Sequence, residues 1–140
     1  MELRDLKGIV TSVPEVGKET TLRQLLDIMA RSHADMLPVV ERGTLVGVVS
    51  EQDLLRLVRA QPVAGMSAVL IRDMPKHIEG RYVSEIMSHG PMTTSPGEAV
   101  EDIIKRMAAS GVKAAVVVEG GKVLGIVRLH DILRKYYSFR

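Results

Sequence analysis

The sequence repeats itself at an offset of 78 residues. Residues 37–58 read LPVVERGTLVGVVSEQDLLRLV and residues 115–136 read AVVVEGGKVLGIVRLHDILRKY, and the two stretches align without a gap. Such a repeat constrains the fold more than any single motif, because both copies are expected to adopt the same structure. Identical residues stand at Val39, Val40, Glu41, Gly43, Gly47, Val49, Asp53, Leu55 and Arg56 and again at Val117, Val118, Glu119, Gly121, Gly125, Val127, Asp131, Leu133 and Arg134.

Each copy is expected to contain two helices and a β-hairpin. Val-rich runs flank Arg42-Gly43 in the first copy, and a two-residue loop that ends in Gly is a hairpin signal. Ser50 to Asp53 then opens an amphipathic segment. Upstream, Ser95-Pro96-Gly97-Glu98 predicts a capping box at the start of a helix in the second copy. The spacing of one helix face is found at Leu22, Leu25, Leu26, Met29 and Ala30, and again at Val100, Ile103, Ile104, Met107 and Ala108.

These elements predict a mixed α+β fold of two β-α-β-β-α repeats packed by pseudo-twofold symmetry. A single unit of roughly 50 residues exposes an apolar face that it covers poorly, whereas a second copy can cover it. We expect the first repeat at residues 9–58, a connector at 59–83 and the second repeat at 84–137. The apolar run Met66–Ile71 predicts a short helix in the connector.

The composition argues against several classes of protein. Hydrophobic residues make up 46% of the chain, which is enough for an aliphatic core. The absence of Cys excludes a disulfide scaffold, a thiolate metal site and a Cys nucleophile. The four His residues lack ligand spacing and no Ser/His/Asp set can be assembled, so we expect neither a metal nor catalysis.

The expected compartment is the cytoplasm. The polar start MELRDLKG is unlike a signal peptide, and no apolar run approaches the roughly 20 residues of a membrane helix. The net charge of +2 is too small to indicate nucleic-acid binding by itself.

Both copies resemble CBS domains, the modules named after cystathionine β-synthase. The resemblance rests on LPVVE at 37–41, GVVSEQDL at 47–54, EIMS at 85–88, VVVE at 116–119, GIV at 125–127 and DIL at 131–133. It covers about residues 9–137 and is that of a stand-alone CBS pair. It implies a regulatory protein without catalysis that forms a homodimer and senses an adenine-containing ligand. AMP, ADP, ATP and S-adenosylmethionine are the expected ligands, in place of a catalytic cofactor.

Asp53 has two competing interpretations. The N–H groups at a helix N-terminus favour a phosphate, and an acid in the first turn can accept the hydroxyls of a ribose. However, Ser50-x-x-Asp53 also resembles a capping box, which needs no ligand. In the second copy Arg128 replaces Ser50 and cannot cap in this way, yet Asp131 is still present. The resemblance favours ligand contact for Asp53, and capping remains the alternative.

The resemblance implies two ligand sites, each made of residues from both copies. Lys113 would bind a phosphate in site one, and Asp53 would bind the ribose. Met92 and Val112 would contact the base. In site two Asp35 takes the position of Lys113, and its charge would oppose a phosphate, so we expect site one to be the better nucleotide site. Site one comprises Ser50, Asp53, Pro91, Met92, Thr93, Thr94, Val112 and Lys113, and site two comprises Arg128, Asp131, Ser12, Val13, Pro14, Asp35 and Met36.

Two other classes of function are compatible with the sequence. If Asp53 and Asp131 only cap helices, the chain is a ligand-independent scaffold or oligomerisation module. The tail from Arg134 to Arg140 mixes basic and aromatic residues, as proteins that bind single-stranded nucleic acid do. Because Leu133 and Tyr137 also fit the end of a core helix, nucleic acid is the less favoured partner. The sequence does not identify a protein that the chain would regulate.

Overall fold

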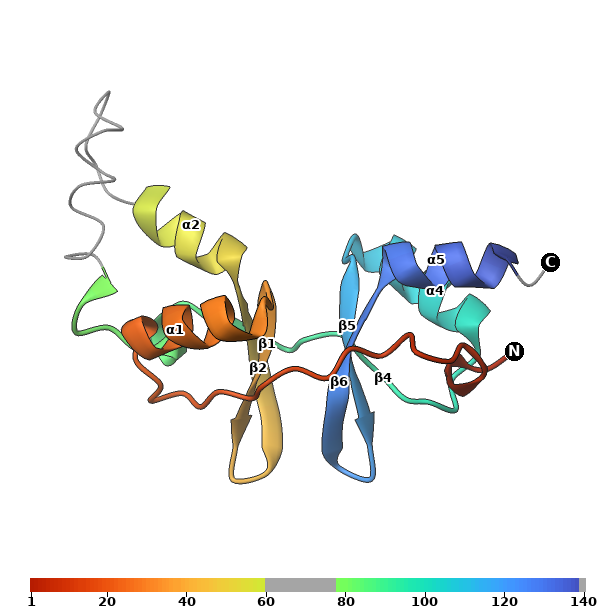
Figure 1. Ribbon diagram of the computed structural model, residues 1–140, viewed down its shortest axis with the longest axis horizontal. Helices are drawn as coiled ribbons and strands as arrows, with labels where there is room; N and C mark the ends of the chain where they lie inside the picture. The colour runs from red at the N-terminus through yellow and green to blue at the C-terminus, as the bar shows by residue number, and fades with distance from the viewer. Residues whose placement is uncertain (60–77, 139–140) are drawn as a thin grey trace. The chain divides into compact units, whose positions relative to one another are not determined.

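The computed structural model of the protein describes residues 1–59 and 78–138 (Figure 1). The chain divides into two compact units. The first unit comprises residues 14–89 and contains the first repeat except residues 9–13, and the second unit comprises residues 1–13 and 90–140. Each unit has a three-stranded sheet and helices, which confirms the predicted mixed α+β class. The helix predicted at Met66–Ile71 lies outside the described residues.

The sheet of the first unit has the strand order β1-β2-β3. Both of its strand pairs are antiparallel. Val16 adds a parallel bridge to Val39 on the other side of β1. In chain order the elements are α1 (Leu22–Ser32), β1 (Met36–Glu41), β2 (Thr44–Ser50), α2 (Glu51–Arg59), the 3-10 helix η2 (Val83–Glu85) and β3 (Ser88–His89).

The sheet of the second unit has the order β4-β5-β6, with β4 parallel to β5. Thr11 adds an antiparallel bridge to Ile126 on the far side of β6. Helices α4 and α5 contact each other. In chain order the elements are the 3-10 helix η1 (Leu3–Asp5), β4 (Thr93–Thr94), α4 (Val100–Ser110), β5 (Ala114–Glu119), β6 (Lys122–Arg128) and α5 (Leu129–Ser138).

The structure confirms the predicted hairpin turn. Arg42 and Gly43 have φ values of 50° and 78°, and Gly120 and Gly121 have 58° and 78°. Positive φ at both loop residues is the type I′ geometry, which matches the twist of the two strands. The turns join β1 to β2 and β5 to β6 in equivalent registers.

Helices α1 and α4 begin differently. Thr21 caps α1 in a reciprocal capping box with Gln24, in which each side chain accepts the other's backbone N–H at 3.1 and 2.9 Å. The capping box predicted at Ser95 is wrong, because α4 begins at Val100 after Ala99, which makes no side-chain cap. The carbonyl oxygens of Pro96 and Glu98 instead accept N–H groups of the N-terminal segment at 2.9 Å each, so residues 96–98 form a turn ahead of the helix.

The N-terminal segment is part of the second unit's core. Leu3 and Leu6 are each 1% exposed and Ile9 is 4% exposed. They pack in one cluster with residues of α4, β5, β6 and α5, such as Ile103 and Ile132. The N-terminal end of the chain therefore completes the core of the second unit.

Gly47 and Gly125 are equivalent residues that allow a third segment to lie close to each hairpin. A Cβ atom on Gly47 would lie 2.5 Å from the carbonyl oxygen of Ser88, and one on Gly125 would lie 2.2 Å from that of Thr11. Both distances are too short for a side chain, which explains why each copy has Gly at this position.

Candidate functional site

Several predicted ligand residues of the second unit gather at one end of its sheet. The N–H of Leu129, the first residue of α5, donates to the carbonyl oxygen of Lys113 at 2.8 Å. Ala114 pairs with Arg128 across β5 and β6, and the carbonyl oxygen of Met92 accepts the N–H of Val116 at 2.9 Å. The register therefore brings Met92, Lys113 and Arg128 to the sheet end where α5 begins.

This group combines basic side chains, an acid and apolar surface. Lys113 is exposed and Arg128 is half-buried. The Asp131 side chain is 33% exposed, and its Oδ1 lies 3.7 Å from both Arg134 Nη2 and His130 Nδ1, which is too long for a hydrogen bond. Met92 and Val112 are half-buried and pack against the core of the unit. Two cations beside the first turn of a helix suit a phosphate, and a partly exposed carboxylate can accept hydroxyl groups.

The corresponding group of the first unit has a different charge. The N–H of Glu51, the first residue of α2, donates to the carbonyl oxygen of Asp35 at 3.0 Å, and Met36 pairs with Ser50. Asp35 is exposed and stands where the second unit has Lys113. This sheet end therefore presents an acid where the other presents a base, which makes it the less favourable place for a phosphate.

Asp53 forms the capping box that the sequence left as an alternative. Its Oδ2 accepts the backbone N–H of Ser50 at 2.8 Å and the Ser50 hydroxyl at 3.1 Å, and the Ser50 Oγ accepts the N–H of Asp53 at 3.4 Å. Its Oδ1 accepts a hydrogen bond from the Arg56 guanidinium and one from the Ser88 hydroxyl at 3.4 Å. Asp53 is 3% exposed, so protein groups satisfy both of its oxygens.

Arg56 and Ser88 contact Asp53 but are not among the residues that the sequence predicts for the site. Arg56 lies three residues after Asp53 on one helix, a spacing that favours an ion pair and was visible in the sequence. Ser88 lies 35 residues away in sequence and reaches Asp53 because β3 pairs with β2. No local pattern could have indicated that contact.

Thr94 and Thr93 hold the turn before α4. Thr94 is 4% exposed, and its hydroxyl donates to Glu98 Oε1 at 2.7 Å. Arg106 donates to both Glu98 oxygens, at 2.5 and 3.0 Å, and to the carbonyl oxygen of Thr93 at 2.7 Å. Burial raises the pKa of the Glu98 carboxyl, but the hydrogen bonds from Arg106 and Thr94 and the charge of Arg106 outweigh it, so the pKa lies below its ordinary value of 4.5. Thr94 is therefore engaged in the structure of its own unit.

The remaining predicted residues lie close in sequence to the two points where the chain passes from one unit to the other. Ser12 is exposed and Val13 is half-buried, and both follow Thr11, which bridges to Ile126 on β6. Pro14 is exposed and Pro91 is half-buried. The sequence assigned Lys113 to the site of Asp53 and Asp35 to the site of Asp131. Within the units, the backbone places Lys113 beside Arg128 and Asp35 beside Ser50.

The tail residues make contacts inside the second unit. Lys135 Nζ donates to the carbonyl oxygen of Lys7 at 2.5 Å, and the Tyr136 hydroxyl donates to Glu101 at 2.8 Å. These bonds join α5 to the N-terminal segment and to α4. They give the basic and aromatic side chains a structural role without nucleic acid.

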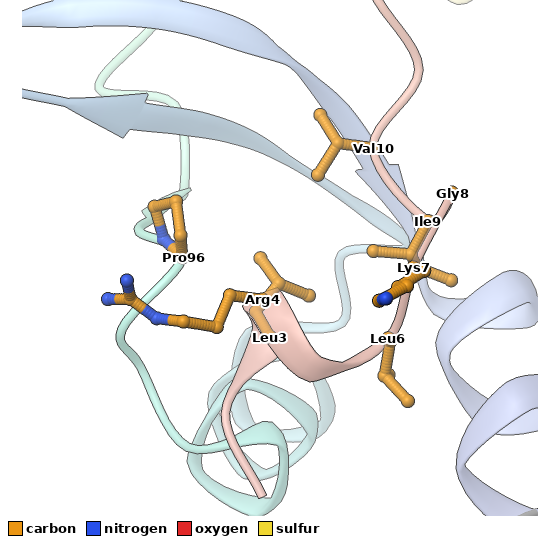
Figure 2. Close-up of a pocket in the computed structure, with 8 residues that line it drawn as sticks. All are labelled: Leu3, Arg4, Leu6, Lys7, Gly8, Ile9, Val10 and Pro96. Carbon is orange, nitrogen blue, oxygen red and sulfur yellow. The ribbon is translucent and has the colours of Figure 1, made fainter.

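A cavity of about 190 Å³ lies in the second unit, beside the N-terminal segment (Figure 2). The buried side chains of Leu3, Leu6 and Ile9 form its apolar part. Figure 2 shows the Arg4 side chain extending toward Pro96. The lining residues are Leu3, Arg4, Leu6, Lys7, Gly8, Ile9, Val10 and Pro96, and none of them is a predicted ligand residue.

Within residues 1–59 and 78–138, no three His, Asp or Glu side chains are grouped so that they could hold a metal ion. None of the helices described in those ranges has the length and apolar character that crossing a membrane requires.

Comparison with protein families and curated proteins gives consistent matches. The model of the CBS domain matches residues 3–60 and 83–138. The CBS domain-containing protein YhcV of Bacillus subtilis is 26% identical over 124 residues, which cover 89% of this chain and 79% of YhcV. The arabinose 5-phosphate isomerase KdsD of Salmonella typhi is 23% identical over 135 residues, which cover 96% of this chain but only 37% of the isomerase.

Solved structures share the fold. The CBS domain of a CBS domain containing membrane protein from Sphaerobacter thermophilus has a TM-score of 0.76 and 26% identity, over 96% of this chain and 87% of that chain. CBSX2 of Arabidopsis thaliana, in a structure with AMP, has a TM-score of 0.75 and 23% identity, over 99% of this chain and 98% of that chain.

Proposed function

Because this chain belongs to the CBS domain family, with two repeats, we propose that it is a non-catalytic regulatory module that binds an adenine nucleotide. Binding would change the conformation or the association of the chain and so act on a partner protein. The structure of CBSX2 with AMP supports this choice of ligand. The isomerase activity of KdsD is not part of the proposal, since the matched region is 37% of that protein.

The proposal is supported by the group of charged side chains at the start of α5. Lys113 and Arg128 lie beside the first turn of the helix, and Asp131 in that turn is partly exposed. We assign the phosphate to Lys113, Arg128 and the helix N-terminus, where cations and N–H groups both favour an anion. Asp131 would accept the ribose hydroxyls, and Met92 with Val112 would contact the base.

This assignment prefers a different Asp from the one that the sequence led us to expect. That expectation preferred the site of Ser50 and Asp53, because it combined them with Lys113 where the other site has Asp35. Asp53 instead has partners for both oxygens, whereas Asp131 has only contacts at 3.7 Å. We therefore propose Asp131 as the principal ribose-binding residue. Asp53 would bind ribose only when its present hydrogen-bond donors are displaced.

The test is a comparison of nucleotide binding in matched variants. AMP, ADP, ATP and S-adenosylmethionine are titrated against the full chain by calorimetry, with melting temperature as a second readout. A ligand at 100 times its Kd adds about 2.7 kcal/mol to the free energy of unfolding, which is readily detected. Lys113→Ala and Asp131→Ala should each weaken binding of the preferred nucleotide by about tenfold or more, as expected for the loss of a charge-assisted contact.

Lys122→Ala is the matched control. Lys122 is exposed at the hairpin end of β6, whereas Arg128 ends the same strand, roughly 20 Å away. The control removes the same charge as Lys113→Ala and should bind like the wild type. Equal losses in Lys113→Ala and Lys122→Ala would show a general charge effect and contradict the assignment of Lys113.

The second candidate is a ligand-independent oligomerisation module. The capping box of Asp53 favours it, since capping accounts for this residue without a ligand. Exposed apolar side chains, among them Leu55 at 51% and Tyr137 at 64%, offer surface for a second copy of the chain. A homodimer in sedimentation experiments with no melting shift for any of the four ligands at millimolar concentration would select this candidate.

A further inference from the structure

Arg56 and Ser88 cover the carboxylate of Asp53. The Arg56 side chain is 59% exposed, while the Asp53 side chain beneath it is 2% exposed. The Arg56 guanidinium and the Ser88 hydroxyl both donate to Oδ1, and the two Ser50 donors occupy Oδ2. A hydroxyl of a ligand can reach Oδ1 only if the Arg56 guanidinium and the Ser88 hydroxyl move away from it.

We propose that Arg56 and Ser88 form a latch on Asp53, which a nucleotide must displace before it can bind to the first unit. This inference rests on the proposed function and adds the regulation of its second, conditional site. Asp131 has no equivalent closed state in the structure, since its Oδ1 lies 3.7 Å from Arg134, the counterpart of Arg56. The two repeats would therefore respond to ligand at different concentrations.

Displacement of Arg56 and Ser88 is favourable only for a ligand that has both hydroxyls and a phosphate. A buried carboxylate left without donors is strongly destabilised, so the ligand must replace the donors that it removes. Two vicinal hydroxyls can donate to Oδ1, and a phosphate can accept the displaced guanidinium, which binds phosphate well. A nucleoside without phosphate leaves Arg56 without a new partner and should open the latch poorly.

Opening the latch would also remove one of the contacts that hold β3. Ser88 belongs to β3, which pairs with β2 at Gly47 and Val48. The next residue after β3 is Gly90, where the chain enters the second unit. Loss of the bond between Ser88 and Asp53 thus acts directly on the segment that leaves the first unit.

The experiment isolates Asp53 by using the Asp131→Ala chain as background. Adenosine and AMP are titrated calorimetrically into this background and into the same background with Arg56→Ala or Ser88→Ala. Arg56→Ala should raise the affinity for adenosine about tenfold, because a charge-assisted competitor is lost. It should lower the preference for AMP over adenosine, since the phosphate loses its partner. Ser88→Ala should raise both affinities by similar, smaller factors.

Arg31→Ala is the matched control in the same background. Arg31 is an exposed Arg of the first unit that pairs with exposed Asp27 at 3.2 Å, so its loss removes the same charge without touching Asp53. It should leave both affinities unchanged. Melting curves of each variant verify folding, and Ser88→Ala decides the question if Arg56→Ala proves unstable.

The two proposals fail in different ways. If the wild type binds AMP but neither Arg56→Ala nor Ser88→Ala raises adenosine affinity in the Asp131→Ala background, the latch is wrong and the proposed function stands. The same conclusion follows if the background binds no adenine ligand and neither variant restores binding. If the wild type binds no adenine nucleotide at all, both proposals are wrong.

Discussion

Asp53 and Asp131 occupy equivalent positions in the two repeats, but the Asp53 side chain is 2% exposed and the Asp131 side chain is 33% exposed. The residue three positions earlier also differs between the two repeats. Ser50 forms a capping box with Asp53, whereas Arg128 has no hydroxyl to offer Asp131. The two halves of the chain are therefore unequal although their sequences align without a gap.

The capping box predicts an asymmetry in stability. Ser50→Ala should lower the free energy of unfolding by about 0.5–2 kcal/mol, because α2 loses its N-cap. Asp53→Asn should cost about 1–3 kcal/mol, since a charged acceptor of several hydrogen bonds is lost. Asp131→Asn, the matched change in the second repeat, should stay within about 0.5 kcal/mol of wild type. Urea unfolding measures all three, and an Asp131→Asn loss as large as that of Asp53→Asn would refute the asymmetry.

The glycine contacts predict large losses at two equivalent positions. Gly47→Ala and Gly125→Ala place a Cβ atom 2.5 and 2.2 Å from backbone oxygens, so β3 or residue 11 must move. Each should cost at least about 1–3 kcal/mol, as overpacking does. Gly125 also has a φ of 154°, which adds backbone strain.

Gly121→Ala serves as the control for backbone conformation alone. Its φ is 78° with no atom within 4 Å of the added Cβ, so it should lose only the roughly 1–2 kcal/mol of a left-handed residue. Thermal or urea unfolding gives the comparison. If Gly125→Ala and Gly121→Ala lose the same free energy of unfolding, the close approach of Thr11 to Gly125 is contradicted.

The N-terminal segment should matter for the stability of the second repeat. Leu6 is 1% exposed within that unit's core, so Leu6→Ala should cost about 2–5 kcal/mol. Met1→Ala, at a side chain that is 53% exposed, should change stability by less than about 0.5 kcal/mol. Hydrogen exchange locates the effect, and we expect faster exchange in β5 and β6 of Leu6→Ala. Faster exchange confined to β1 and β2 would show that the N-terminal segment does not belong to the core of the second unit.

Glu98 predicts a loss of stability in acid. Its pKa is lower in the folded chain than in the unfolded one, so its contribution is fully present above pH 4.5 and is lost as the pH falls through the lowered folded value. Glu98→Gln should therefore be less stable than wild type at pH 7, and the difference should shrink at pH 3. Asp102→Asn, at an exposed acid on α4, is the comparison variant. A gap between wild type and Glu98→Gln that is constant with pH would contradict this assignment.

Much of the fold could be predicted because its signals are local. The hairpin turn at Arg42-Gly43 and the apolar spacing of α1 and α4 each depend on residues within one or two turns of chain. The capping box expected at Ser95 failed for a long-range reason. The carbonyl groups of Pro96 and Glu98 bind the N-terminal segment, which is almost 100 residues distant in sequence, and α4 begins only after that contact.

The candidate site was predictable in part. The repeat singled out Asp53 and Asp131 as equivalent residues, and the substitution of Arg128 for Ser50 showed that they differ. The contact of Ser88 with Asp53 could not be foreseen, because it depends on the pairing of β3 with β2. The backbone bond between Lys113 and Leu129 was likewise hidden, since the hairpin of β5 and β6 brings the two residues together.

Two equivalent α+β repeats, each with a two-residue hairpin loop and an acid in the first turn of the following helix, follow from the local sequence pattern. Three further features depend on contacts between distant segments: Leu3 and Leu6 complete the core of the second unit, Gly125 lies against Thr11, and the Asp53 side chain is buried whereas that of Asp131 is partly exposed. The two kinds of feature differ in how far apart in sequence the interacting residues are. Turn geometry and apolar periodicity are properties of neighbouring residues, whereas burial and the pairing of distant groups depend on the path of the whole chain.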